Sequence, residues 1–134
     1  MTSNAILPTR STPNSAGYDI YSSNEVKVCA GQRAVVNTGI AVKIPDGYCG
    51  FIKSRSGLFL NHNIVAFAGT IDSDYVGDVK IILINMSDGD FIVSCGMRFA
   101  QLAICKIYTG SFNEVDILPV TKHGDNGFGS SGYY

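Results

Sequence analysis

A glycine-containing segment between two apolar runs carries the side chains best suited to hydrolytic chemistry. The run AGTIDSDYVGDV spans 68–79 and contains Asp72, Asp74 and Tyr75. A carboxylate beside a bound phosphate can act as a general base toward water or hold magnesium through water. Solvated aspartates at the tip of a hairpin would have the same composition, so the segment alone leaves both interpretations open.

A second candidate is the tetrapeptide SRSG at 54–57, which follows an apolar run. Arg55 can bind phosphate oxygens in a forked geometry, and Ser56 and Gly57 can offer hydroxyl and backbone donors. Such tetrapeptides are also common in surface turns. The segment is not a P-loop, because G-x-x-x-x-G-K-[ST] occurs nowhere in the chain.

Two further segments place polar side chains among apolar ones. SAGYDIYS at 15–22 contains Asp19, and it otherwise has the composition of a turn entering a strand. MRFAQLAI at 97–104 contains Arg98 and Gln101. These two side chains either pair inside the fold, for example Arg98 with Asp74, or Gln101 reaches a ligand.

The C-terminal run HGDNGFGSSGYY at 123–134 contains four glycines in twelve residues. So many glycines do not support a strand or helix, and a frayed terminus would look the same. Phe128 lies among them, however, and an aromatic ring on an arm rich in free amides suits stacking on a planar ligand with phosphates.

Composition excludes several classes of function. The chain has 134 residues, 46% of them hydrophobic, and a formal net charge of -1, which predicts one domain with a core and no footprint for nucleic acid. The four cysteines form no C-x-x-C pair and His62 and His123 are isolated, so no zinc-ligand spacing is present. The start MTSNAILPTRS does not resemble a signal peptide, and no apolar run suits a membrane span. We therefore expect an intracellular protein with buried, free thiols.

Short β-type runs separated by turn residues dominate the chain. They predict an all-β fold, a jelly-roll-like barrel or sandwich, without repeat or linker. One short helix is expected at 57–61, with Ser56 as a possible cap. The expected strands are 25–29, 34–44, 48–53, 64–68, 79–85 and 99–107.

These segments, in their order, resemble the five motifs of the homotrimeric dUTPase family. The resemblance covers nearly the whole chain, as motifs AGYDIYS (16–22), GFIKSRSGLF (50–59), GTIDSDYVGDV (69–79), GMRFAQLAI (96–104) and GDNGFGSSG (124–132). It implies a magnesium-dependent enzyme that hydrolyses dUTP to dUMP and pyrophosphate. Such an enzyme limits uracil in DNA and supplies dUMP for dTMP synthesis.

The resemblance also implies roles for single residues. Asp72 would activate the water that attacks the α-phosphorus, and Tyr75 would pack beneath the deoxyribose and reject UTP. Phosphates would be held by Arg55, Ser56, Gly57 and Gln101, and uracil would be recognised by backbone groups near Ala68, Gly69, Ile71 and Lys80.

Magnesium would be clasped by the three phosphates, with Asp19 binding its waters. The family builds each site from three subunits, so residues 1–122 would form the β core and 123–134 an arm that closes on a neighbouring subunit. Phe128 would cover the uracil, while the phosphate chain would be wrapped by Gly129, Ser130 and Ser131.

One position departs from the family pattern in a way that affects chemistry. Where the family usually has arginine, this chain has His123, with Lys122 before it. Histidine is mostly neutral near pH 7, so contact with the γ-phosphate is expected to be weaker or pH-dependent unless Lys122 substitutes. Ser54 and Thr70 also replace the usual proline and valine, without removing a chemical role.

Three alternatives to a dUTPase remain open from the sequence. A dCTP deaminase would need a proton-shuttling glutamate, and Glu25 and Glu114 both lie outside the motifs. A catalytically weak nucleotide-binding or signalling protein is suggested by His123. A purely structural trimer would leave Asp72 and Phe128 without a role. Cytoplasm and nucleus are both compatible with the sequence.

Overall fold

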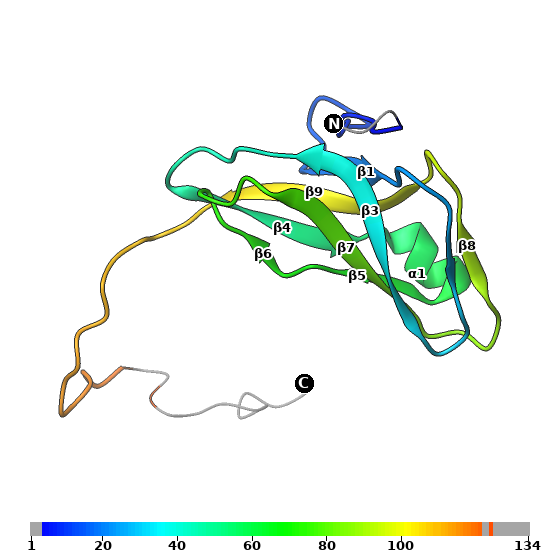
Figure 1. Ribbon diagram of the computed structural model, residues 1–134. Helices are drawn as coiled ribbons and strands as arrows, with labels where there is room; N and C mark the ends of the chain where they lie inside the picture. The colour runs from blue at the N-terminus through cyan, green and yellow to red at the C-terminus, as the bar shows by residue number, and fades with distance from the viewer. Residues whose placement is uncertain (1–3, 122–123, 125–134) are drawn as a thin grey trace.

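The computed structural model describes residues 4–121 and 124, and in them antiparallel strands form three sheets, with one short helix beside them (Figure 1). The largest sheet has the strand order β1-β9-β4-β6, the second β3-β7-β5 and the smallest β2-β8. The strands are β1 Gly17–Tyr21, β2 Val26–Val28, β3 Arg33–Ala41, β4 Tyr48–Ser54, β5 Ile64–Phe67, β6 Thr70–Ile71, β7 Asp78–Asn85, β8 Phe91–Val93 and β9 Arg98–Lys106. The predicted all-β, jelly-roll-like class is confirmed.

All six runs expected as strands are strands, at slightly different bounds. Three short strands were not predicted. β1 lies in the segment 15–22, which has the composition of a turn entering a strand but was not among the six expected strands, while β6 and β8 have only two and three residues. Alternation cannot be recognised over so few residues, because it needs about four or more.

The two larger sheets pack face to face around a single apolar cluster. Alternate residues of β3 and β7 point inward, as their burial patterns show. The core is continuous between the sheets, with members Ile20, Val36, Ile40, Ile52, Ile64, Ile81, Leu83, Phe99 and Leu102.

The helix α1 spans Ser56–His62 and contains the predicted range 57–61. Ser56 is its first helical residue and not its cap, so that expectation was wrong. The N-cap is Arg55 in an extended conformation, and its carbonyl accepts hydrogen bonds from Leu58 N (3.0 Å) and Phe59 N (3.2 Å). The helix therefore starts without a side-chain cap, directly at the end of β4.

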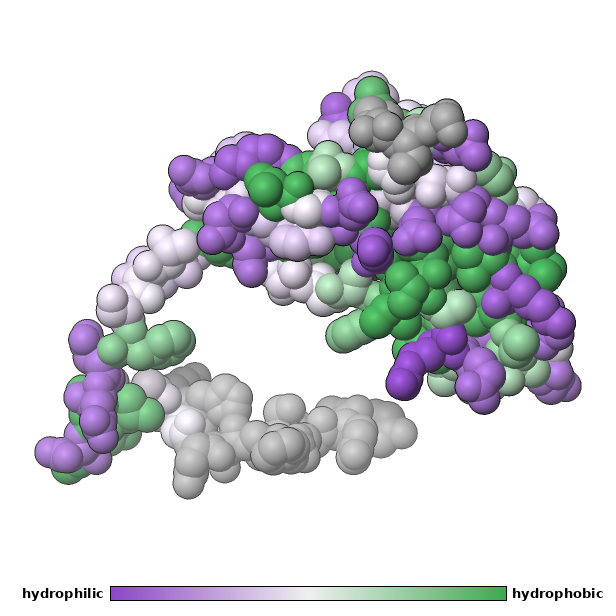
Figure 2. Space-filling model, in the orientation of Figure 1, coloured by the Kyte–Doolittle hydropathy of each residue, from purple (hydrophilic) through white to green (hydrophobic). Residues whose placement is uncertain are grey.

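After β9 the chain leaves the body as a tail without helix or strand through residue 121 (Figure 1). Its large apolar side chains are exposed, and Phe112 at 104% and Val120 at 101% are fully so. Figure 2 shows this tail apart from the body, and shows hydrophobic residues gathered on the body near β5 and α1. Exposed members there include Phe59, Leu60 and Phe67.

No helix in residues 4–121 is long and apolar enough to cross a membrane.

Candidate active site

A hairpin whose two arms separate beyond their last strand pair frames the candidate site. β5 pairs with β7 as far as Phe67 opposite Ile82. Beyond that point the chain turns away into β6, which pairs with β4, while β7 continues along β3. The two arms of the hairpin therefore separate, and a planar group could pair with the backbone edges between them.

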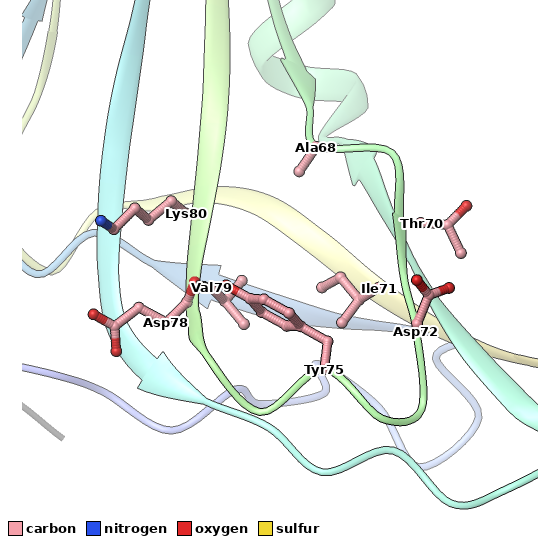
Figure 3. Close-up of a pocket in the computed structure, with 8 residues that line it drawn as sticks. All are labelled: Ala68, Thr70, Ile71, Asp72, Tyr75, Asp78, Val79 and Lys80. Carbon is pink, nitrogen blue, oxygen red and sulfur yellow. Dashed lines mark hydrogen bonds between the residues drawn. The ribbon is translucent and has the colours of Figure 1, made fainter.

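A cavity of about 470 Å³ lies between these separated arms. Figure 3 shows Ile71 and Tyr75 turned into this space, with Asp72 at its edge and its carboxylate on the side of the strand away from β7. The cavity is lined by Ala68, Thr70, Ile71, Asp72, Tyr75, Asp78, Val79 and Lys80. The expected uracil, sugar and catalytic positions thus lie together. Gly69 joins two lining residues, and its carbonyl accepts a hydrogen bond from Ile52 N at 3.4 Å.

Tyr75 is held at the mouth of the cavity by its own loop. Its hydroxyl donates to the Asp78 carbonyl at 2.8 Å, and its backbone N–H donates to the Asp72 carbonyl at 3.2 Å. A Cβ on Gly77 would lie only 2.7 Å from the Tyr75 hydroxyl, so a glycine is needed for the ring to pack there. The loop itself is tied to the body by Lys43, whose Nζ donates to the Ser73 carbonyl at 2.8 Å.

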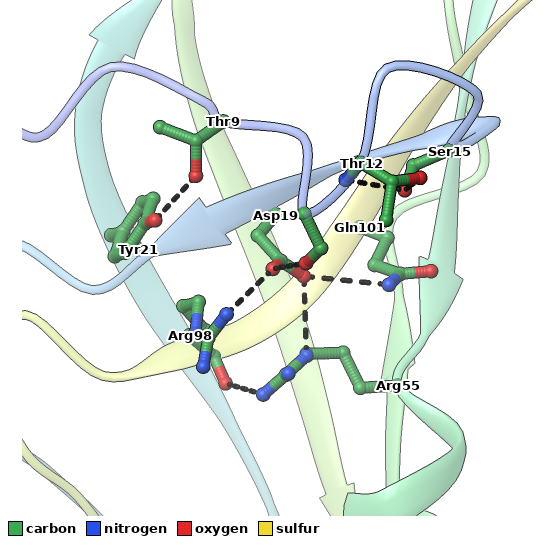
Figure 4. Close-up of polar contacts among 9 residues, drawn as sticks. Thr9, Thr12, Ser15, Asp19, Tyr21, Arg55, Arg98 and Gln101 are labelled. Carbon is green, nitrogen blue, oxygen red and sulfur yellow. Dashed lines mark hydrogen bonds and ion pairs between the residues drawn. The ribbon is translucent and has the colours of Figure 1, made fainter.

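A second polar cluster gathers around Asp19, which is 2% exposed (Figure 4). Arg98 Nη1 lies 3.2 Å from Asp19 Oδ2 and donates to it. Arg55 Nε lies 3.2 Å from Oδ1, close enough for an ion pair, but its N–H is not aimed along that line and this buried atom has no hydrogen bond. Arg55 Nη1 instead donates to the Arg98 carbonyl at 2.8 Å. Two guanidinium groups against one carboxylate leave the cluster with an excess positive charge, which suits phosphate.

Gln101, Ser56 and Gly57 lie beside this cluster. Gln101 Nε2 donates to Asp19 Oδ1 at 3.4 Å, and Gly17 makes room for its side chain, because a Cβ there would approach Gln101 Oε1 to 3.0 Å. Ser56 and Gly57 are exposed at the start of α1, next to Arg55. The residues expected to bind phosphate therefore share one region.

No residue of the Asp19 cluster lines the cavity beside Asp72. The remaining predicted positions lie outside the described residues: His123, Phe128, Gly129, Ser130 and Ser131. Arg98 pairs with Asp19 and not with Asp74, so the pairing suggested from the sequence was wrong. Neither Glu25 nor Glu114 lines the cavity.

Sequence reasoning did not assign the residues that place the functional ones. One is Arg98, which pairs with Asp19. The others are Gly77, which leaves room for the Tyr75 ring, and Lys43, which binds the Ser73 carbonyl. The only available signal was an arginine within an otherwise apolar run.

The prediction of buried thiols is confirmed for Cys49 and wrong for Cys29, Cys95 and Cys105, which are exposed; all four are free.

Comparison with known proteins identifies the family. The model of the dUTPase family matches residues 3–132. The chain belongs to the dUTPase family. It is 48% identical over 128 residues to the deoxyuridine 5'-triphosphate nucleotidohydrolase of Arabidopsis thaliana, a match that covers 96% of this chain and 77% of the plant protein.

Solved dUTPase structures share its fold. The dUTPase of Staphylococcus bacteriophage 80alpha with dUPNHPP is 33% identical and has a TM-score of 0.93, covering 98% of this chain and 94% of the phage chain. A variant dUTPase of phage phi11 of S. aureus, whose structure describes coordination of a structural Mg(II) ion, is 30% identical with a TM-score of 0.82 and covers 87% and 93%.

Proposed function

We propose that this member of the dUTPase family hydrolyses dUTP to dUMP and pyrophosphate by attack of water on the α-phosphorus. The cavity of the opened hairpin carries the proposal, because it brings an aromatic ring and separated strand edges together, with Asp72 at its edge. Asp72 is the general base that takes the proton from the attacking water. The product is consistent with a role in limiting uracil in DNA and in supplying dUMP for dTMP synthesis.

Base and sugar are selected within this cavity. Backbone groups near Ala68, Gly69, Ile71 and Lys80 recognise uracil, and the amino group of cytosine would leave buried polar groups unpaired there. Tyr75 packs beneath the deoxyribose. Its hydroxyl bond to the Asp78 carbonyl holds the ring in position, so that a 2′-hydroxyl would have no room.

Phosphates bind at the Asp19 cluster. Arg55, Ser56 and Gly57 hold the chain of phosphates, and Gln101 contacts one of them. The buried Nε of Arg55 has no hydrogen bond in the part of the chain that the structure describes. A bound phosphate would therefore give this guanidinium a hydrogen-bond acceptor that it lacks. Asp19 keeps Arg55 and Arg98 together against their mutual repulsion.

Magnesium fits this site only through substrate and water. In residues 4–121 no group of three or more His, Cys, Asp or Glu side chains could hold a metal ion. Both carboxylate oxygens of Asp19 already face a guanidinium, so Asp19 reaches a metal-bound water only if one arginine turns toward the phosphates. When bound, the metal neutralises charge on the triphosphate.

We also propose that three subunits share each site. The Asp19 cluster does not line the cavity beside Asp72, which supports this, because phosphate-binding and base-recognition groups from different subunits would then complete one site. The exposed apolar tail supports it as well, since side chains such as Phe112 and Val120 need a covering partner. The segment 123–134, with Phe128 over uracil and Gly129, Ser130 and Ser131 around the phosphates, then closes a neighbour's site.

The location proposed for the protein is intracellular, in cytoplasm or nucleus. Four free cysteines, three of them exposed, suit a reducing compartment.

A signalling role is a second candidate. The structure of the 80alpha dUTPase is described with phage dUTPases that control transfer of virulence genes by a G protein-like mechanism, and this chain has the same fold. One protein can have both a signalling role and hydrolytic activity. A measurement of dUTP turnover therefore decides whether the chain is an enzyme, before any signalling role is tested.

Asp72→Asn tests the proposed chemistry. The variant keeps the shape of the side chain but removes the base, so kcat is expected to fall roughly 10²-fold or more, while affinity for a non-hydrolysable dUTP analogue is kept. Asp74→Asn is the matched control, because Asp74 is exposed and does not line the cavity. Near-normal turnover of Asp72→Asn would remove Asp72 from the mechanism.

A further inference from the structure

Two cysteines outside the proposed machinery face each other across the central strands of the largest sheet. Cys49 on β4 is paired with Cys105 on β9. Two residues along the same ladder, Ile107 N donates to the Gly47 carbonyl at 2.9 Å. Hydrogen-bonded pairs alternate in an antiparallel ladder, so Cys49 and Cys105 are also such a pair, with a Cα separation of about 5.5 Å. A disulfide typically spans about 4.4–6.8 Å between Cα atoms and about 3.5–4.5 Å between Cβ atoms. The Cβ atoms of a hydrogen-bonded pair lie near 5.5 Å apart, so the bond requires the two strands to move together by about 1 Å.

The side chains of the two cysteines lie on the same face of the sheet, because they are directly opposite each other. Cys49 is buried and Cys105 is exposed. Burial, with further contributions from Cys105 and Asp72, raises the pKa of the Cys49 thiol. The sulfur of Cys105 is therefore the one that a small oxidant in solution reaches first, and Cys49 is the protected partner beside it.

The pair also lies next to the proposed general base. β4 pairs with β6 at Gly50 opposite Ile71, so the next positions along that ladder are Cys49 and Asp72. Cys105, Cys49 and Asp72 thus form a row across three strands. A bond between the two sulfurs would draw Cys49 toward β9 and away from the carboxylate.

We propose that Cys49 and Cys105 form a redox site that a peroxide oxidises to a cross-strand disulfide. The Cys105 sulfur attacks one oxygen of hydrogen peroxide, the O–O bond breaks, and a sulfenic acid and one water result. The Cys49 sulfur then attacks the Cys105 sulfur, the S–O bond breaks, and the second water leaves with the Cys49 proton. Two thiols lose two electrons in total, and the peroxide is reduced to two waters.

The test uses the folded, full-length protein treated with hydrogen peroxide, after which remaining thiols are alkylated and linked peptides are mapped by mass spectrometry. A variant with Cys29→Ser and Cys95→Ser keeps only the facing pair. It is expected to lose both free thiols, to give one peptide linking Cys49 to Cys105, and to regain both thiols with dithiothreitol. It should remain monomer-sized on a non-reducing denaturing gel.

Two single changes complete the design. Cys105→Ser, at an exposed position, and Cys49→Ser, a change of similar size at a buried one, should each abolish the linked peptide. The proposal is overturned if the two-cysteine variant keeps both thiols, links only between chains, or carries Cys105 on to sulfinic acid with Cys49 still free. It is also overturned if folded wild-type protein links these cysteines mainly to Cys29 or Cys95.

Discussion

Tyr75 shows how a single functional side chain depends on neighbours that do no chemistry. Its ring packs where Gly77 has no side chain, and its hydroxyl is bound by the Asp78 carbonyl. In the proposed account, this packing against the loop places the aromatic ring where a 2′-hydroxyl would otherwise fit. The discrimination between dUTP and UTP is therefore expected to rest on the ring more than on the hydroxyl.

Tyr75→Ala is expected to reduce the ratio of kcat/KM for dUTP over UTP by roughly tenfold or more, because the space beside the sugar opens. Tyr75→Phe keeps the ring and loses only the 2.8 Å hydrogen bond, so its ratio should change less. Steady-state kinetics with both nucleotides measure the effect. An unchanged ratio in Tyr75→Ala would show that another group selects the sugar.

At the same scale, the Asp19 cluster marks a limit of prediction from sequence. Asp19 and Gln101 could be recognised as polar residues within strands, and their register opposite each other follows once β1 and β9 pair. The contact of Asp19 with Arg98, 79 positions away, could not be predicted, because strand alternation specifies a face and not a partner. The wrong pairing of Arg98 with Asp74 has this origin.

Among the elements, the helix α1 has little to stabilise it on its own. It has seven residues, begins without a side-chain cap and buries only Leu58. Gly57, in its first turn, has open space where a Cβ would be, and its φ is not positive, so folding does not require glycine there. In the proposed account, close approach of a phosphate to the backbone explains the glycine.

Gly57→Ala separates these explanations. Alanine favours a helix interior over glycine by about 1 kcal/mol, so the melting temperature should be unchanged or slightly higher. The value of kcat/KM for dUTP should nevertheless fall by roughly tenfold, because the added methyl group displaces the phosphates from their position. Gly89→Ala is the matched control, since Gly89 also has open space and lies in the turn after β7. Equal kinetics in both variants would make Gly57 a residue without a role in binding.

The elements also divide into those that sequence can predict and those it cannot. Runs rich in β-branched residues, such as 34–44 and 79–85, are long enough to be recognised as strands. β6 has two residues and owes its existence to the edge of β4. The opening of the hairpin, and with it the cavity, depends on that pairing and could not be derived from local pattern.

The whole molecule is incomplete as one chain, in the proposed account, because its phosphate cluster and its base cavity belong to different sites of the trimer. Mixing Asp72→Asn subunits with subunits truncated before His123 should therefore restore part of the activity that each lacks. Some mixed trimers contain a site with an intact Asp72 from one chain and an intact arm from another. Turnover measured after confirmed subunit exchange decides the matter. Activity that stays at the level of the separate variants would mean that each chain builds its own site.

The most direct measurement is release of pyrophosphate from dUTP, dCTP, dTTP and UTP by the wild-type protein, with magnesium and with the metal chelated. The account predicts magnesium-dependent turnover of dUTP, with a kcat/KM that exceeds those of the other three nucleotides by roughly 10²-fold or more. Absence of turnover, or similar efficiencies with all four nucleotides, would contradict it.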